Sequence, residues 1–167
     1  ASRRLPKHCQ EDPILLGECL GGAMYIEDFR RLLLKMGIQD YRIVTQNRIT
    51  VSDPEIVSKI GDTEFYSITF RAFKITELED KCEDYGQVAY YQGTIPESPI
   101  EFRLDDHHLF KRNTPLLVCS NTAKMLTGTR FSQHFKVLGN TDHHLGLFDC
   151  GPGALNSQNS AQGTSCC

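Results

Sequence analysis

The sequence predicts an α/β sheet edge followed by a small α+β domain. Residues 22–75 contain, in order, the patterns of a helix, a strand, a short helix and a second strand, an order typical of the end of an α/β sheet. From residue 76 onward the apolar segments become short and mostly strand-like. The first block is too small to bury the core of a complete doubly wound domain, so we expect the edge of a larger sheet.

The first block has recognisable start and stop signals. Apolar residues recur at helical spacing over 23–36, and Gly37 follows as a stop. Asp53 and Pro54 form a helix start, in which a capping residue precedes a proline in the first turn. We therefore expect a helix over 23–36, a strand over 41–51, a short helix ending at about Ile60 before Gly61, and a strand over 64–75.

The second block begins after a polar connector at residues 76–81. Its strand-like segments are short and separated by turn residues, which is typical of a small α+β domain. We expect strands over 87–95, 100–104, 115–118 and 130–138, and a helix over 120–126 capped by Ser120, Asn121 or Thr122. The predicted domains are thus 1–75, the end of a larger core, and 76–150, a C-terminal domain. Residues 151–167 are rich in Gly, Ser, Asn and Gln, and we expect a flexible tail that ends in Cys166 and Cys167.

Composition excludes several classes of function. The net charge is −3 and no basic stripe occurs, so we expect no nucleic-acid partner. No apolar run approaches the roughly 20 residues of a membrane-spanning helix, and no signal-peptide pattern is present, so we expect no membrane partner. The chain begins Ala1-Ser2-Arg3-Arg4, which reads like the interior of a protein and suggests a fragment. We expect a monomer.

The seven cysteines form no disulfide framework, because their number is odd and their gaps are wide and irregular. No Asn-x-Ser/Thr sequon is present. We therefore expect reduced thiols in a cytoplasmic protein. For Cys82, Cys119 and Cys150, packing is a better interpretation than a redox pair. The two cysteines of the tail, Cys166 and Cys167, are candidates for loose binding of soft ligands or for thiol exchange.

Cys19 lies in the segment Gly17-Glu18-Cys19-Leu20-Gly21-Gly22, ahead of the first predicted helix. A helix N-terminus presents unpaired N–H groups and a positive dipole end, and both favour the thiolate that binds soft metals and metalloids. The negative charge of Glu18 opposes this effect. Taken alone, a single cysteine in such a place is more often a packed small side chain than a functional one.

Other polar clusters give weaker signals. Asp105-Asp106-His107-His108 and Asp142-His143-His144 resemble metal-ligand sets, but neighbouring residues on a strand point to opposite faces. We favour hydrogen-bonded or solvated loop roles, with a zinc site using His107 or His108 and Cys119 as the open alternative. Arg71 and Lys74 are most simply solvated charges.

Several segments, in the same order, resemble arsenite S-adenosylmethionine methyltransferases. The resemblance covers nearly all of residues 3–151 and includes the Gly-Glu-Cys segment around Cys19. The matching segments are Arg3 to Pro6, Leu16 to Tyr25, Gly61 to Phe65, Phe70 to Lys74, Cys82 to Ala89, Leu104 to His108, Val118 to Thr122, Thr129 to Phe131 and His144 to Cys150.

The resemblance implies a class I, Rossmann-like methyltransferase that acts in arsenic detoxification. It implies that Cys19 is one of three thiolates that hold arsenic(III), either arsenite or its thiol conjugate. S-adenosylmethionine then supplies the methyl group, and a thiol reductant such as glutathione or thioredoxin returns the arsenic to its trivalent state.

The same resemblance places the other arsenic-binding cysteines and the glycine-rich cofactor turn upstream of residue 1. No such turn occurs in the chain, so we expect an upstream methyltransferase domain as partner and an inactive isolated fragment. Thr63 stands where some family members have a cysteine, and Cys9 is a weak candidate to replace that thiol. Two alternatives stay open: a stand-alone thiol-based arsenic or soft-metal binding module, and a docking domain whose cysteines are incidental.

Overall fold

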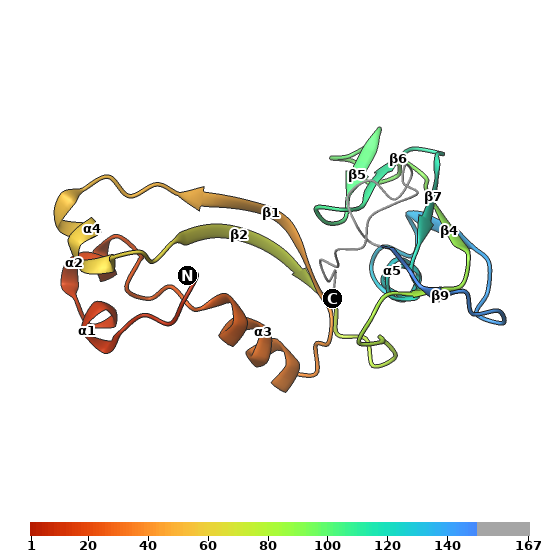
Figure 1. The fold of residues 1–167 in the computed structure, drawn as a ribbon. Helices are drawn as coiled ribbons and strands as arrows, with labels where there is room; N and C mark the ends of the chain where they lie inside the picture. Colours follow the sequence, from red (N-terminus) through yellow and green to blue (C-terminus); the bar gives the residue numbers. More distant parts are fainter. Residues whose placement is uncertain (150–167) are drawn as a thin grey trace. The chain divides into compact units, whose positions relative to one another are not determined.

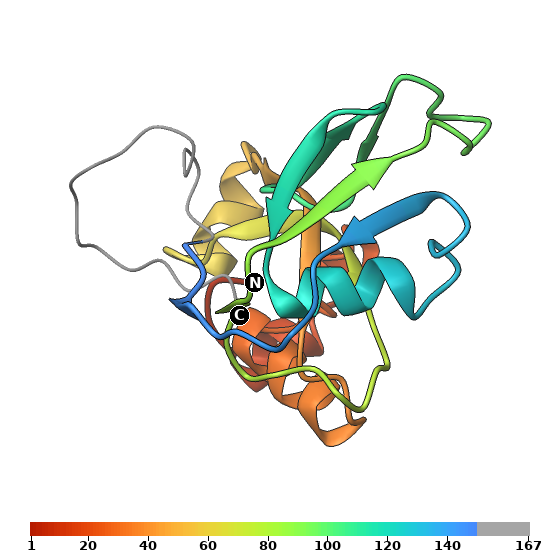
Figure 2. The same cartoon turned by 90° about the vertical axis from the view of Figure 1, so that its right-hand side faces the viewer.

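The computed structural model describes residues 1–149 and contains short helices and mainly antiparallel strands (Figures 1 and 2). The helices are α1 (Lys7–Gln10), α2 (Pro13–Gly17), α3 (Ile26–Lys35), α4 (Pro54–Ile60) and α5 (Ser120–Thr127). The strands are β1 (Tyr41–Ile49), β2 (Phe65–Ala72), β3 (Glu83–Asp84), β4 (Gln87–Tyr91), β5 (Glu101–Arg103), β6 (Leu109–Lys111), β7 (Pro115–Val118), β8 (Phe135–Leu138) and β9 (Gly146–Leu147). Among these residues, no helix has the length and apolar content needed to cross a bilayer.

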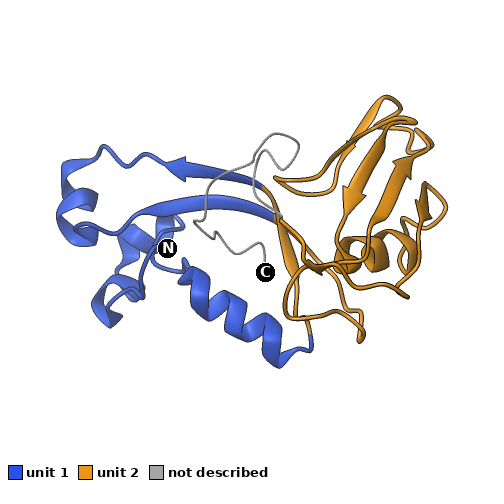
Figure 3. Ribbon diagram, turned by 45° about the vertical axis from the view of Figure 1, so that its right-hand side comes forward, with its two compact units in different colours: residues 1–37, 45–69 blue, residues 38–44, 70–167 orange. Residues whose placement is uncertain are grey.

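The described chain forms two compact units (Figure 3). The first comprises residues 1–37 and 45–69, and the second comprises 38–44 together with the chain from residue 70 onward. Strands β1 and β2 pair as a two-stranded sheet, and each contributes residues to both units. The predicted domain limits at 75 and 150 stay predictions. Cys150 and the predicted tail over 151–167, which includes Cys166 and Cys167, lie outside the described residues.

The helices and strands predicted between residues 23 and 75 are present as α3, β1, α4 and β2. Asp12 and Asp53 each precede a proline and accept backbone N–H groups of the first turn, so α2 and α4 begin in the same way. Gly61 ends α4 with a φ of 56°. Lys59 of α4 donates to Asp12 at 2.7 Å and so ties the two helices together. The sequence did not predict α1 or α2, because helices this short show no hydrophobic period.

The second unit is built around a three-stranded antiparallel sheet in the order β7-β4-β8. Helix α5 packs against this sheet, and a second antiparallel pair, β5-β6, lies beside it. Its core contains a connected group of aromatic rings, formed by Tyr91, Phe102, Phe110, Phe131 and Phe135. Aromatic rings bury much apolar area per residue, which suits a unit of this size.

Two predictions for this unit were wrong in detail. The strand predicted over 130–138 is confined to Phe135–Leu138, because Ser132 and His134 donate backbone hydrogen bonds to Thr129 and Phe131 and fold the preceding residues into turns. The cap of α5 is Cys119 instead of a residue from 120 to 122. Its sulfur accepts the Thr122 N–H at 3.4 Å.

Candidate functional site

Cys19 lies directly after the C-terminal end of α2, in a turn of defined geometry. The Cys19 N–H donates to the Leu16 carbonyl at 3.1 Å, and the Leu20 N–H donates to the Leu15 carbonyl at 2.8 Å. These two bonds make the Schellman motif, in which the residue in the Cys19 position adopts a left-handed conformation. The buried side chains of Leu15 and Leu20 belong to one core cluster and supply the apolar contact that commonly accompanies the motif.

The backbone at Cys19 is strained. Its φ is 60°, a value that glycine adopts readily and that costs an L-residue roughly 1–2 kcal/mol. Among the described residues, Asn113 is the other non-glycine with positive φ, and asparagine tolerates this region better. The structure therefore holds a cysteine at a position where the turn itself favours glycine.

The prediction that Cys19 lies at the N-terminus of a helix is wrong. Helix α3 begins at Ile26, so Cys19 does not lie at its N-terminus, and the nearest helix end is the carbonyl end of α2. The dipole there does not favour a thiolate. What the turn provides is exposure: of the described cysteines, Cys9, Cys82 and Cys119 are buried and Cys19 is exposed.

The turn leaves no room at the next glycine. A Cβ built on Gly21 would lie 3.0 Å from the Cys9 carbonyl oxygen and 3.2 Å from the Leu16 side chain, whereas one on Gly22 meets nothing within 4 Å. Gly21 thus allows the backbone after Cys19 to pack closely against α1 and α2. This packing fixes the path of the backbone that follows Cys19.

The neighbouring candidates do not add a second exposed thiol. The buried Cys9 side chain donates to the Lys59 carbonyl at 3.4 Å, so the weak suggestion that it replaces a missing thiol finds no support in its environment. Thr63 is buried at the turn after α4, where its N–H donates to the Ile60 carbonyl.

A buried ionic cluster in the second unit went unrecognised in the sequence. Arg42 of β1 donates to Asp40 at 2.8 Å, lies 3.5 Å from Asp105, and its Nη2 is 3.9 Å from the Cys119 sulfur. The side chains of Arg42, Asp40 and Asp105 are almost inaccessible to solvent. Within residues 1–149, Asp40 Oδ1 and Arg42 Nε have no hydrogen-bond partner. The Asp40-x-Arg42 spacing alone carried no signal, because the partners lie far along the chain.

Asp105 accepts several hydrogen bonds in this cluster. Its Oδ1 accepts the N–H groups of His107 and His108 at 2.9 and 2.6 Å, and the His108 ring lies 2.8 Å away. Burial raises the pKa of Asp105, but the hydrogen bond from His108 and the charges of His108 and Arg42 outweigh it and hold this pKa below its ordinary value. For Arg42, burial opposes the charge, but the neighbouring Asp40 outweighs it and raises the guanidinium pKa.

These contacts favour the hydrogen-bonded interpretation of the Asp-Asp-His-His segment. Among the described residues, one cluster of metal-type donors occurs, Asp105, Asp106 and His107, with donor atoms within 4.8 Å of one another, and it leaves out Cys119. The Asp105 oxygens are already used by protein donors, so a cation would have to displace several hydrogen bonds. In the other segment, His144 contacts Glu83 at 2.9 Å.

Arg71 is not a solvated charge, contrary to expectation. Its guanidinium is partly buried and donates to the carbonyls of Arg103 and Leu104. The guanidinium carbon lies 5.1 Å from the centroid of the Phe102 ring. Lys74 is exposed, as expected.

Comparisons with known proteins find arsenite methyltransferases. Residues 84–150 match the model of the arsenite methyltransferase C-terminal domain. The whole chain aligns with an arsenite methyltransferase of Aquipseudomonas alcaligenes at 44% identity, covering 49% of that protein. The mouse and human arsenite methyltransferases each align with 81% of the chain at 35% identity, which covers 35% and 36% of their lengths.

A solved structure gives the same result. The crystal structure of an arsenic(III) S-adenosylmethionine methyltransferase from Chlamydomonas reinhardtii matches with a TM-score of 0.81 and 46% identity, over 89% of this chain and 50% of that one. The fold thus corresponds to part of an S-adenosylmethionine-dependent methyltransferase. Within that class, the chain is similar to arsenite methyltransferases over its whole length, which confirms the resemblance seen in the sequence. It spans about half the length of the relative that it matches over its whole sequence.

Proposed function

We propose that this chain supplies one arsenic-binding thiolate, Cys19, to an enzyme that methylates arsenic(III) with S-adenosylmethionine and so detoxifies arsenic. The observation that carries the proposal is the Cys19 turn, in a chain whose relatives are arsenite methyltransferases. An exposed cysteine in a left-handed position stabilises neither the turn nor the core. Local strain of this kind is typical of functional positions.

The chemistry of arsenic(III) suits this thiol. Trivalent arsenic is a soft centre that prefers thiolate ligands, and Cys19 binds it by displacing a hydroxide or a small thiolate from arsenite or its thiol conjugate. The thiol proton leaves with the displaced group. The Schellman turn limits the directions available to the Cys19 sulfur, so a bound arsenic atom is held in a narrow range of positions.

The methyl donor is assigned to an upstream methyltransferase domain. Within the described residues, Gly21 and Gly22 follow a helix end instead of a strand, so they do not fit the glycine-rich turn that holds a nucleotide cofactor. S-adenosylmethionine, when bound to the upstream domain, supplies an electrophilic methyl group. Methyl transfer takes the arsenic lone pair into the new As–C bond, so two electrons from a thiol reductant, glutathione or thioredoxin, are needed to regenerate arsenic(III).

The first unit also has surfaces suited to such a domain. Within the described residues, β1 and β2 form a sheet of two strands, and a two-stranded ribbon is at best marginally stable in water without cover. On α3 and just after it, Leu32, Leu34 and Met36 are exposed. We assign β1 and β2 to the edge of the upstream sheet and these side chains to the interface with it. The whole enzyme would be a cytoplasmic monomer.

The test compares methyl transfer by the chain alone and by the chain joined to the upstream half of its own reading frame. The proposal requires activity only in the joined protein and its loss in Cys19→Ser. Turnover by the 167-residue chain alone would contradict the assignment of the methyl donor. Tight arsenic binding by the lone chain, lost on removing Cys166 and Cys167, would instead favour a stand-alone binding module.

A further inference from the structure

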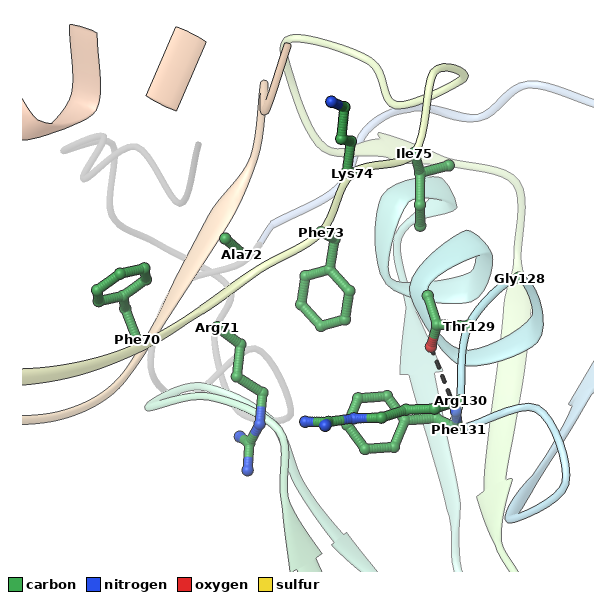
Figure 4. Close-up of a pocket in the computed structure, with 10 residues that line it drawn as sticks. All are labelled: Phe70, Arg71, Ala72, Phe73, Lys74, Ile75, Gly128, Thr129, Arg130 and Phe131. Atoms are coloured by element: carbon green, nitrogen blue, oxygen red, sulfur yellow. Dashed lines mark hydrogen bonds between the residues drawn. The ribbon is translucent and has the colours of Figure 1, made fainter. Parts of the chain in front are cut away.

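The second unit contains a cavity of about 530 Å³ lined by residues 70–75 and 128–131 (Figure 4). A neighbouring hollow of about 360 Å³ shares Arg71, Arg130 and Phe131 with it. In Figure 4 the side chains of Arg71 and Arg130 extend toward one another across the cavity, whereas Lys74 points away. The two arginines come from segments far apart in the chain, the end of β2 and the turn after α5.

The two guanidinium groups have no counter-charge of their own. In the described part of the chain, neither forms an ion pair with a carboxylate. Asp105, the acidic group that acts on Arg71 electrostatically, is already bonded to Arg42 and His108. Burial and then the nearby Arg130 lower the pKa of Arg71, which shows that the pair repels.

The surrounding groups hold Arg71 in place. Its Nη1 donates to the carbonyls of Arg103 and Leu104, and its guanidinium lies over Phe102. The Arg130 guanidinium carbon lies 5.2 Å from the centroid of the Phe131 ring. A guanidinium group that stacks on an aromatic face presents its remaining N–H donors in one plane, which suits the oxygens of a carboxylate or phosphate. The phenylalanines of the lining provide an apolar wall.

We propose that this cavity binds a small organic anion, whose carboxylate or phosphate group lies between Arg71 and Arg130 and whose apolar part packs against Phe73 and Phe131. The site is separate from the Cys19 turn and does not depend on the arsenic-binding role. An anion there relieves the repulsion between the two arginines, so binding also stabilises the second unit.

Calorimetric titration of the whole chain with phenylphosphate, benzoate, inorganic phosphate and neutral benzamide tests the proposal. We expect phenylphosphate or benzoate to bind more tightly than inorganic phosphate, and benzamide not to bind. If phenylphosphate binds more tightly than benzoate, the site prefers a phosphate group, and the reverse order indicates a carboxylate. Arg130→Gln, a change at an exposed residue that leaves the core intact, should weaken binding by about tenfold or more, the typical loss of one hydrogen bond to a charged group. Lys74→Gln removes one positive charge from the same lining segment, but from a side chain that points away from the cavity, and should change affinity less than about twofold.

Three results would overturn the inference. One is that none of the anionic probes binds. Another is equal weakening by Arg130→Gln and Lys74→Gln, which would indicate general charge attraction. The third is equal affinity for phenylphosphate, benzoate and inorganic phosphate, which would exclude a role for the apolar wall. Since Arg71→Gln also removes hydrogen bonds to two carbonyls, the Arg130 variant carries the test.

Discussion

The Leu20 N–H donates to the Leu15 carbonyl oxygen at 2.8 Å, and this bond closes the turn that holds Cys19 with a φ of 60°. The turn needs the left-handed backbone but not the sulfur. The proposed arsenic-binding role offers a reason for the sulfur, because arsenic(III) is a soft centre that prefers thiolate ligands. Stability and function should therefore respond differently to changes at this residue.

Cys19→Gly should leave the chain at least as stable as the parent, because glycine removes the left-handed strain. The greater conformational entropy of glycine in the unfolded chain cancels only part of this gain. Cys19→Val should cost about 1–2 kcal/mol, since a β-branched residue fits this region poorly. Urea unfolding measures both. Asn113→Gly, at the other left-handed non-glycine position, is the control and should change stability little. A valine variant as stable as the glycine variant would show that the turn is not strained.

Gly21→Ala should destabilise the first unit by about 1–2 kcal/mol, because its Cβ would lie 3.0 Å from the Cys9 carbonyl oxygen. Gly22→Ala has open space and should be close to neutral. Thermal unfolding of the pair measures the difference. Equal effects would mean that the turn after Cys19 is not packed as described.

Arg42→Met should cost about 3 kcal/mol, because it leaves the buried carboxylates of Asp40 and Asp105 without their cation. Arg48→Met removes an exposed pair with Glu64 and should cost less than about 1 kcal/mol. Denaturant unfolding of both variants provides the comparison. Similar losses of unfolding free energy in the two variants would show that burial does not determine how much Arg42 contributes to stability.

Asp105→Asn should destabilise the chain at neutral pH by an amount that shrinks in acid. The pKa of Asp105 is lower in the folded chain than in the unfolded chain, so its stabilisation is present above about pH 4 and disappears as the pH falls through the folded pKa. Urea unfolding at pH 7, 5 and 3 checks this. Asp106→Asn, a change at an exposed neighbour, should be nearly neutral at pH 7, and a pH-independent loss in Asp105→Asn would rule out the ionic explanation.

Much of the fold was predictable because its signals are local. Asp53 and Pro54 begin α4, Gly61 ends it, and the helical spacing of apolar residues marks α3. The Schellman turn at Cys19 was missed because α2 is too short to show a period and because the usual glycine signal is replaced by a cysteine.

The side-chain clusters were not predictable, since they join residues far apart in the sequence. Arg42 and Asp105 are separated by 63 positions, and the segment around each has no unusual composition. Arg71 and Arg130 likewise meet only through the tertiary fold, so a sequence without homologues shows each as a surface charge. Cys19 could be singled out only through its resemblance to a known segment, and its geometry then supplied a physical reason.

The central claim is tested most directly by measuring how tightly a trivalent phenylarsenical binds the chain joined to its upstream domain, in the parent and in Cys19→Ser. Serine keeps the size and left-handed backbone of the residue but removes the soft ligand, so stability should be unchanged. We predict a loss of affinity of at least about tenfold in the serine variant, as expected when a soft thiolate ligand is replaced by a hydroxyl. Equal binding by the two proteins would contradict the assignment of Cys19 as an arsenic ligand.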